Sequence, residues 1–152
     1  MLKRLILIVG SLLCLVWPVS GRGLDVGPAV FRWQDVVPGK VVARPFVLRV
    51  TNRSDLPQNY TVHVRQPGQI NSRPDKGFEP LPETSWLSLA TRDIRVPPRT
   101  TQQVPVFLKV PAKSVNYGKA WQAYIEVREK TNRRGGLALA CYPKVLIKTI
   151  KK

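Results

Sequence analysis

The side chains that most often carry out catalysis or bind metals are few in this chain. His63 is the single histidine, and Cys14 and Cys141 are the two cysteines. His63 falls on the polar face of a predicted strand, where a solvated side chain is expected. One histidine cannot supply a multi-histidine metal site or the base of a histidine-dependent nucleophile on its own.

Carboxylates give no clearer indication of catalysis. The nine Asp and Glu residues are separated along the chain, and although Glu79 and Glu83 share one segment, their spacing does not fix the convergent geometry that acid–base catalysis needs. The sequence also contains no glycine-rich phosphate loop, no paired-cysteine motif and no calcium loop. We therefore predict a protein that is not an enzyme, with no catalytic residues, no metal site and no cofactor.

The N-terminal segment is typical of a secretory signal peptide. Lys3 and Arg4 supply positive charge, and residues 5–17 are almost entirely apolar. Small residues around position 21 fit a cleavage site. We therefore expect residues 1–21 to be a signal peptide and the protein to be periplasmic or secreted.

The apolar run is too short for a typical membrane span. A spanning helix needs about 20 apolar residues, and Pro18 ends this run earlier. We expect residues 22–152 to form one domain with no integral membrane span in the mature chain. The alternative is that the segment is retained as an anchor.

Removal of the signal peptide would leave Cys141 as the single cysteine of the mature chain, so a disulfide within that chain is excluded. Cys141 ends the apolar run 137–141, which favours a small buried side chain. An intermolecular disulfide in an oxidising compartment is the alternative.

The chain is strongly basic, with 25 Lys and Arg residues against nine Asp and Glu and a formal net charge of +16. Export removes nucleic acid from ordinary contact, so we predict no nucleic-acid partner. The charge then favours an acidic protein, lipid headgroups or an anionic envelope polymer. Because the basic residues are scattered along the mature chain, a solvated basic surface is the alternative.

Short runs of alternating apolar and polar residues, separated by Pro, Gly, Asn and Asp, predict an all-β domain. About seven or eight short strands are expected, as in a β-sandwich. The expected strands cover residues 30–33, 46–51, 59–65, 86–89, 93–96, 104–110, 121–128 and 137–150.

Several of these strands carry more specific expectations. Residues 46–51 and 59–65 are expected to form a hairpin across the polar loop 52–55. Pro105 is expected to place its strand at a sheet edge or in a bulge, because proline cannot donate to a ladder. Residues 121–128 alternate so regularly that a half-buried strand is expected.

The stretch from Pro67 to Glu83 has little alternation, and about 15 residues is long for a passive connection. It is therefore the candidate functional loop. Phe78 lies in this loop, and Phe107 and Tyr124 oppose the apolar faces of their strands, so exposure of the last two is expected. Such aromatic side chains could contact a sugar or a protein partner, although core and rim packing is the alternative.

Several segments share one recognisable pattern: residues 86–89, 94–99, 104–111 and 118–127, with Pro38-Gly39 and Thr51-Asn52-Arg53-Ser54. They resemble segments of bacterial extracytoplasmic immunoglobulin-like domains. The resemblance implies an immunoglobulin-like β-sandwich, and such domains serve as surface-protein modules, carbohydrate-associated domains and assembly chaperones.

The chain is also similar, more distantly, to the N-terminal domains of periplasmic pilus chaperones. Those chaperones hold the terminal carboxylate of a subunit with two basic side chains while donating a strand to its open sheet. The resemblance implies Arg32 in the first strand and Lys144 in the last as that basic pair. The chain departs from this family in one respect: those chaperones carry a second domain, whereas we expect one domain here.

The leading functional hypothesis is a non-enzymatic exported interaction module. It would bind another envelope or surface protein through a sheet edge or through the loop 67–83, because main-chain hydrogen bonds supply affinity with little sequence signature. One alternative is a binder of anionic or carbohydrate envelope polymers. A further alternative is a chaperone-like assembly factor for pilus-type surface subunits. The binding residues predicted for these hypotheses are Arg32, Lys144, Phe78, Phe107 and Tyr124.

Overall fold

A computed structural model of the chain describes residues 23–42, 45–131 and 137–152. The predicted signal peptide, residues 1–21, lies outside these ranges. Within them, the regular structure consists of β-strands and short 3-10 turns.

The strands are β1 (Leu24–Gly27), β2 (Val30–Val36), β3 (Phe46–Asn52), β4 (Gln58–Arg65), β5 (Glu79–Pro80), β6 (Leu87–Leu89), β7 (Asp93–Val96), β8 (Thr101–Leu108), β9 (Ala120–Glu129), β10 (Ala140–Cys141) and β11 (Lys144–Thr149). The 3-10 turns are η1 (Pro67–Ile70), η2 (Thr84–Trp86) and η3 (Ser114–Asn116).

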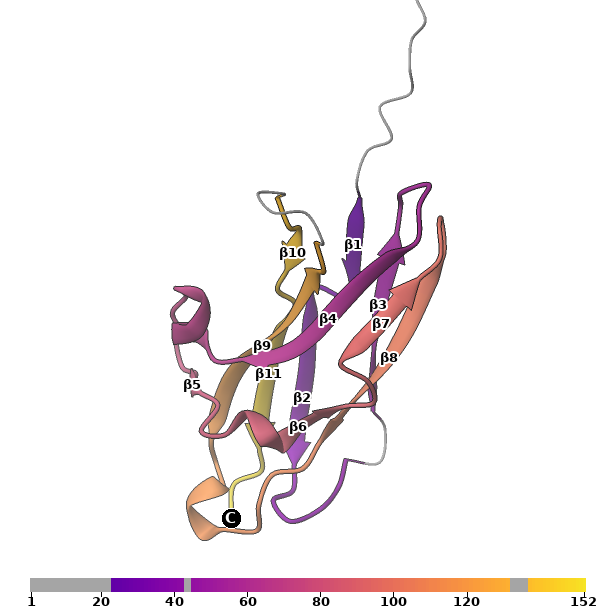
Figure 1. Ribbon diagram of the computed structural model, residues 1–152. Helices are drawn as coiled ribbons and strands as arrows, with labels where there is room; N and C mark the ends of the chain where they lie inside the picture. Colours follow the sequence, from indigo (N-terminus) through magenta and orange to yellow (C-terminus); the bar gives the residue numbers. More distant parts are fainter. Residues whose placement is uncertain (1–22, 43–44, 132–136) are drawn as a thin grey trace, which may run out of the picture.

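Two sheets pack face to face as a sandwich (Figure 1). The small sheet has the strand order β1-β3-β8-β6, and the large sheet has the order β2-β11-β9-β4-β7. Strands β5 and β10 add to β9 in the large sheet. The prediction of an all-β sandwich is therefore confirmed.

The first strand of the domain is divided between the two sheets. β1 pairs antiparallel with β3 in the small sheet, and β2 pairs parallel with β11 in the large sheet. The chain crosses from one sheet to the other at Gly27 and Pro28, which are joined by a cis peptide bond. The sequence predicted β2 but not β1, because four residues that include Asp25 and a glycine show no clear strand pattern.

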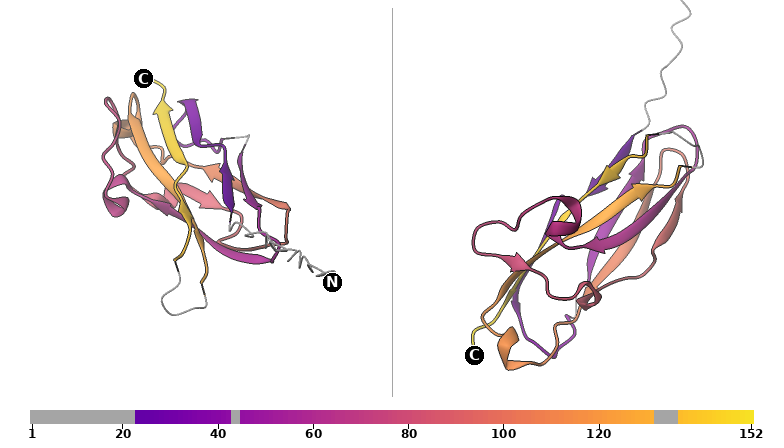
Figure 2. Two further views of the ribbon diagram at one scale, coloured as in Figure 1. Left: turned by 90° about the horizontal axis from the view of Figure 1, so that it is seen from above. Right: turned by 60° about the vertical axis from the view of Figure 1, so that its left-hand side comes forward.

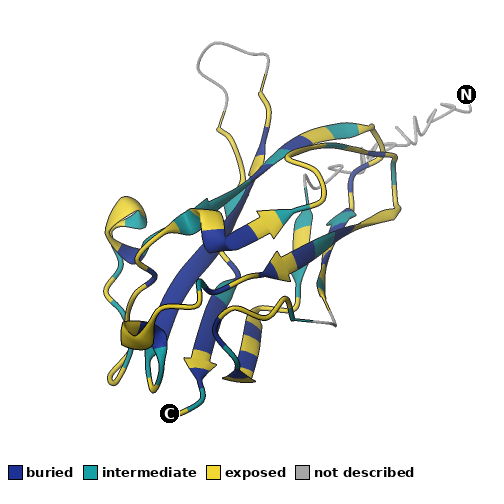
Figure 3. Ribbon diagram, turned by 90° about the horizontal axis from the view of Figure 1, so that it is seen from below, coloured by how far each residue is buried: buried dark blue, intermediate teal, exposed yellow. Residues whose placement is uncertain are grey.

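The core lies between the sheets and is built from the alternating apolar positions of their strands. Figure 3 shows the buried residues along the strands and the exposed residues mainly in the connections. Trp121 on β9 is 2% exposed, and its ring meets that of Trp86 at 5.1 Å between centroids in an edge-to-face arrangement. Trp121 therefore belongs to the core.

The predicted hairpin between residues 46–51 and 59–65 is wrong, although both strands exist. β3 pairs with β1 and β8 in the small sheet, whereas β4 pairs with β9 and β7 in the large one. Asn52, fully buried at the end of β3, donates from Nδ2 to the carbonyl oxygens of Val96 at 3.1 Å and Pro97 at 3.2 Å. The chain therefore turns across the sandwich at this point instead of folding back within one sheet.

The expected edge position of Pro105 is also wrong. β8 lies between β3 and β6, and Pro105 is opposite Val47. The carbonyl of Pro105 accepts a hydrogen bond from the N–H of Ala90, which follows the last residue of β6. Proline is tolerated in this internal strand because its missing N–H falls where the pairing with β6 ends.

Tyr60 on β4 gives the fold a pH dependence in the alkaline range. Burial, together with the smaller effects of the nearby Glu129 and Cys141, raises the pKa of its phenol from 10.0 to about 12. The unfolded chain then loses this proton at lower pH than the folded chain, so stability falls as the pH rises from 10 towards 12. Ultraviolet titration of the phenols should show a late step that Tyr60→Phe removes; a late step that persists in this variant would assign it to another tyrosine.

Candidate partner-binding site

Residues 66–80 cross the outer face of β9 in the large sheet, in front of that strand in the right-hand view of Figure 2, and end in β5, which pairs with β9. The N–H of Asp75 donates to Oε1 of Gln122 at 2.8 Å, and Ser72 Oγ lies 3.0 Å from the hydroxyl of Tyr124. Gln122 Nε2 also donates to that hydroxyl at 2.9 Å. We call residues 66–80 the covering loop.

The covering loop changes the environment of β9. Gln122 is fully buried, and Tyr124 is 8% exposed. The expectation of a half-buried strand at residues 121–128 is therefore wrong, and so is the expectation that Tyr124 is exposed. The long connection predicted between Pro67 and Glu83 exists, and much of it packs against the sheet through polar contacts.

Arg32 and Lys144 lie on the two neighbouring parallel strands β2 and β11, where Lys144 is opposite Val30 and Arg32 is opposite Leu146. The ammonium group of Lys144 donates to both carboxylate oxygens of Asp75, at 2.7 and 2.8 Å. Lys144 therefore already holds a carboxylate that the covering loop supplies. The structure thus places the predicted basic pair on adjacent strands and shows that one member is occupied from within the chain.

Arg32 lines a small pocket of about 90 Å³ together with Phe78, Leu146 and Lys148. Lys148 Nζ lies 5.5 Å from the centroid of the Phe78 ring, a cation–π distance. Two cationic groups therefore border this pocket. Sequence reasoning missed Lys148. The spacing of two residues from Lys144 through Leu146 to Lys148 could have placed all three on the same face of β11.

Phe107 is 37% exposed, as expected. It lies on β8, opposite Ser88 of β6, and so belongs to the small sheet. Arg32, Phe78 and Lys144 are on the large sheet or over its outer face. Phe107 therefore cannot contact the same small ligand as those residues.

Glu126 forms a buried ionic cluster on the outer face of β9. Its carboxylate accepts hydrogen bonds from Arg65 at 2.8 Å, from Arg128 at 2.6 Å and from the hydroxyl of Tyr142 at 3.2 Å. Burial raises the pKa of Glu126, but the bonds and charges of Arg128 and Arg65 outweigh it, and the net pKa lies below the usual value. The paired carboxylate therefore remains ionised and acts as a structural anchor between β4 and β9.

Residues 137–143 contain β10 and run along β9, close to β1 of the small sheet. We call this segment the hairpin edge. β10 pairs with β9 through Ala140 opposite Arg128, and no strand in the described ranges pairs with its other side. Leu137 is 88% exposed and Leu139 is 37% exposed. A strand period of two places Leu137, Leu139 and Cys141 on one face.

Cys141 is half-buried and has no disulfide partner among the described residues. Burial raises the pKa of its thiol, and the charge of Asp25 adds to this effect. A raised pKa lowers the thiolate fraction, which reduces the reactivity of the group. The intermolecular disulfide stays a prediction.

The described ranges do not bring three His, Cys, Asp or Glu side chains into an arrangement that could hold a metal ion. His63 lies half-buried on β4. Across the same ranges, no helix is long and apolar enough to cross a membrane.

Comparisons with known proteins give a likeness in structure without one in sequence. No protein-family model matches the chain, and no curated protein matches it either. A PapD-like domain of human CEP192 matches with a TM-score of 0.62 and 8% identity over 97% of this chain and 99% of that domain.

Bacterial chaperones match as well. The periplasmic chaperone SfaE gives a TM-score of 0.58 at 10% identity, covering 84% of this chain and 58% of the other. The CsuC–CsuE complex of chaperone and tip adhesion subunit from Acinetobacter baumannii gives 0.58 at 8% identity, covering 84% and 57%. This chain therefore spans a little over half the length of these two matched chains.

At such low identities the likeness establishes the fold alone. The chain has an immunoglobulin-like β-sandwich, as the predicted fold class stated, and its distant similarity to pilus chaperone domains is confirmed in structure. The same fold in a human protein means that fold does not determine the compartment. Similarity to surface-protein modules stays a prediction.

Proposed function

We propose that the protein is a non-enzymatic exported binding domain with a chaperone-like role towards a surface-protein subunit. The observation that carries the proposal is the hairpin edge, where Leu137 and Leu139 are exposed beside a strand that is paired on one side. An extended segment of the subunit would pair with this edge through main-chain hydrogen bonds. Pockets on the subunit would take the alternate apolar side chains.

The basic residues at the start of β2 and β11 support the same proposal. Arg32 is exposed, and Lys144 begins β11 directly after the hairpin edge. A partner carboxylate would bind Arg32 and would replace Asp75 at Lys144. An exposed ion pair such as Asp75–Lys144 contributes about 0 to 1 kcal/mol, so this exchange costs little.

The binding of an anionic polymer is a second candidate function, favoured by the basic C-terminal residues. Lys152 Nζ lies 5.9 Å from the centroid of the Tyr117 ring, and the side chain of Lys151 passes close to Gly118. With Lys148, these residues bring positive charge to one end of the sandwich. Polymer binding through such charges would weaken steeply with salt.

Capture experiments with Leu137→Asp combined with Leu139→Asp test the proposal. We expect the unaltered protein to retain a subunit from an envelope extract at both low and high salt. The double variant should recover at least about tenfold less of this subunit, because a charged side chain cannot enter an apolar pocket of the partner. The recovered subunit is measured by quantitative mass spectrometry.

Val115→Asp is the matched control, because Val115 is 67% exposed and belongs to η3, outside the hairpin edge. It should leave recovery unchanged, whereas Arg32→Ala and Lys144→Ala should lower it without changing the unfolding temperature. Equal recovery by the unaltered protein and the double variant would contradict the proposal. Binding that high salt abolishes and that the leucine changes do not affect would favour the anionic polymer.

A further inference from the structure

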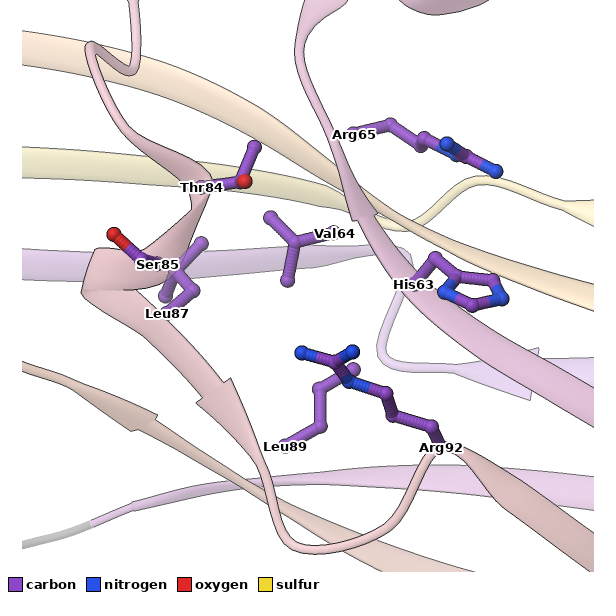
Figure 4. Close-up of a pocket in the computed structure, with 8 residues that line it drawn as sticks. All are labelled: His63, Val64, Arg65, Thr84, Ser85, Leu87, Leu89 and Arg92. Atoms are coloured by element: carbon purple, nitrogen blue, oxygen red, sulfur yellow. The ribbon is translucent and has the colours of Figure 1, made fainter.

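A pocket of about 250 Å³ lies on the other side of β9 from the hairpin edge, between β4 of the large sheet and β6 of the small sheet (Figure 4). Residues of β4, η2 and β6 line it, together with Arg92 from the turn between β6 and β7. None of the functional residues predicted from the sequence lies in this pocket. It is therefore a separate feature of the molecule.

Two unpaired strand edges border this pocket. β7 pairs with β4 only along Gln58–Thr61, and the N–H of Val62 then donates to the carbonyl of Arg92 at 2.8 Å. Beyond that point, no strand in the described ranges pairs with β4 on this side. β6 pairs with β8 on one side, and its other side has no paired strand within the same ranges.

The hydrogen-bonding pattern of the two ladders shows which backbone groups are free. The carbonyl of Asn59 accepts a bond from Lys130, so the alternation of an antiparallel ladder points the N–H and C=O of Val64 away from β9. Ala90 bonds to β8, so Leu89 points its backbone groups away from β8. Free donors and acceptors therefore occur on both edges, as a strand-binding site requires.

The side chains add an apolar floor and a positive charge. Figure 4 shows Val64 and Leu87 turned towards the space between the edges, with the guanidinium group of Arg92 extending into the same space near Leu89. Within the described ranges, the guanidinium group of Arg92 has no hydrogen bond or ion pair. Arg65, in contrast, points away and binds Glu126.

We propose that this corner is a second binding site, which accepts an extended segment of an acidic partner protein as an added strand along β4. An apolar residue of the segment would lie against Val64 and Leu87. A carboxylate two positions away would point to the same face and pair with Arg92. The segment recognised therefore has an apolar and an acidic residue separated by one position.

Charge favours an acidic partner over a second copy of the chain. The chain has a formal net charge of +16, so two copies repel each other. The guanidinium group of Arg92 at the pocket favours a ligand that carries a negative charge. The second binding site uses β4 and β6, whereas the proposed chaperone-like role uses β10 and β11. An experiment can therefore contradict one of the two proposals without contradicting the other.

Nuclear magnetic resonance of the ¹⁵N-labelled protein with a capped peptide, acetyl-Thr-Val-Thr-Glu-Thr-amide, tests the proposal. We expect saturable shifts of the amide signals of Val64 and Leu89. A matched peptide with Lys in place of Glu should bind about tenfold more weakly. Arg92→Glu should reverse this preference, so that the Lys peptide binds more tightly than the Glu peptide.

Arg95→Glu provides the control, because Arg95 is exposed on β7 and makes the same charge change outside the pocket. It should leave both peptides unaffected beyond about twofold. The proposal is overturned by the absence of saturable shifts, by shifts confined to residues 137–143, or by equal binding to the unaltered protein and a folded Arg92→Glu variant. Self-association through this corner, detected by sedimentation, would also overturn it.

Discussion

Replacing Asn52 with aspartate is expected to lower the free energy of unfolding by about 3 to 5 kcal/mol at neutral pH, the range found when a buried charge is left without a partner. Asn52 is fully buried, and its amide nitrogen donates to the carbonyl oxygens of Leu56, Val96 and Pro97. Aspartate has no donor and would turn a negative charge towards these oxygens. The two hydrogen bonds that the N–H and the hydroxyl of Ser54 donate to Oδ1 would not offset this change.

Urea unfolding of the Asn52→Asp variant measures this effect. The destabilisation should shrink as the pH is lowered towards the usual pKa of aspartate, about 3.9, because protonation removes the buried charge and restores one donor. Asn59→Asp is the matched control, since Asn59 is exposed on β4 and its change should cost less than about 0.5 kcal/mol. Equal unfolding midpoints for the two variants would show that the bonds of Asn52 do not stabilise the fold.

Trp121→Ala is expected to lower the free energy of unfolding by a similar amount, about 3 to 5 kcal/mol. The side chain of Trp121 is buried in the core and packs against Trp86, which immediately precedes β6. Truncation therefore leaves a cavity and also removes the support of the short edge strand. Trp121→Phe keeps an aromatic ring in the core and should cost clearly less.

Chemical denaturation of both Trp121 variants checks this ordering. Hydrogen exchange at Ser88 and Ala90, whose N–H groups face β8, should accelerate more in Trp121→Ala than in the Phe variant, because the support of β6 is lost. If the Ala variant proved as stable as the Phe variant, Trp121 would not be a principal core residue.

The strands could be predicted because their signals are local. The alternation in residues 46–51 and 59–65 and the polar loop between them appear in the sequence itself. The pairing of these strands could not be predicted, since a polar loop joins strands of one sheet or of two equally well. The deciding contacts, from Asn52 to Val96 and Pro97, join residues far apart in the sequence.

The candidate site was predictable in part for the same reason. Similarity to chaperone domains implied Arg32 in the first strand and Lys144 in the last as a basic pair, and in the structure these two strands are neighbours. The burial of Tyr124 was not predictable, because alternation shows that a strand has a second face but not whether a distant loop covers it. The same holds for Asp75 at Lys144, a contact across 69 positions of the chain.

The parallel pairing of β2 with β11 has a mechanical consequence. Both strands run in the same direction, so the start of β2 at Val30 and the end of β11 at Thr149 lie at opposite ends of the pair. A pull that separates these two residues would slide the strands along each other and strain their hydrogen bonds simultaneously. The sandwich would then resist stretching by the combined strength of that ladder, whereas a peeling force would meet its bonds one after another.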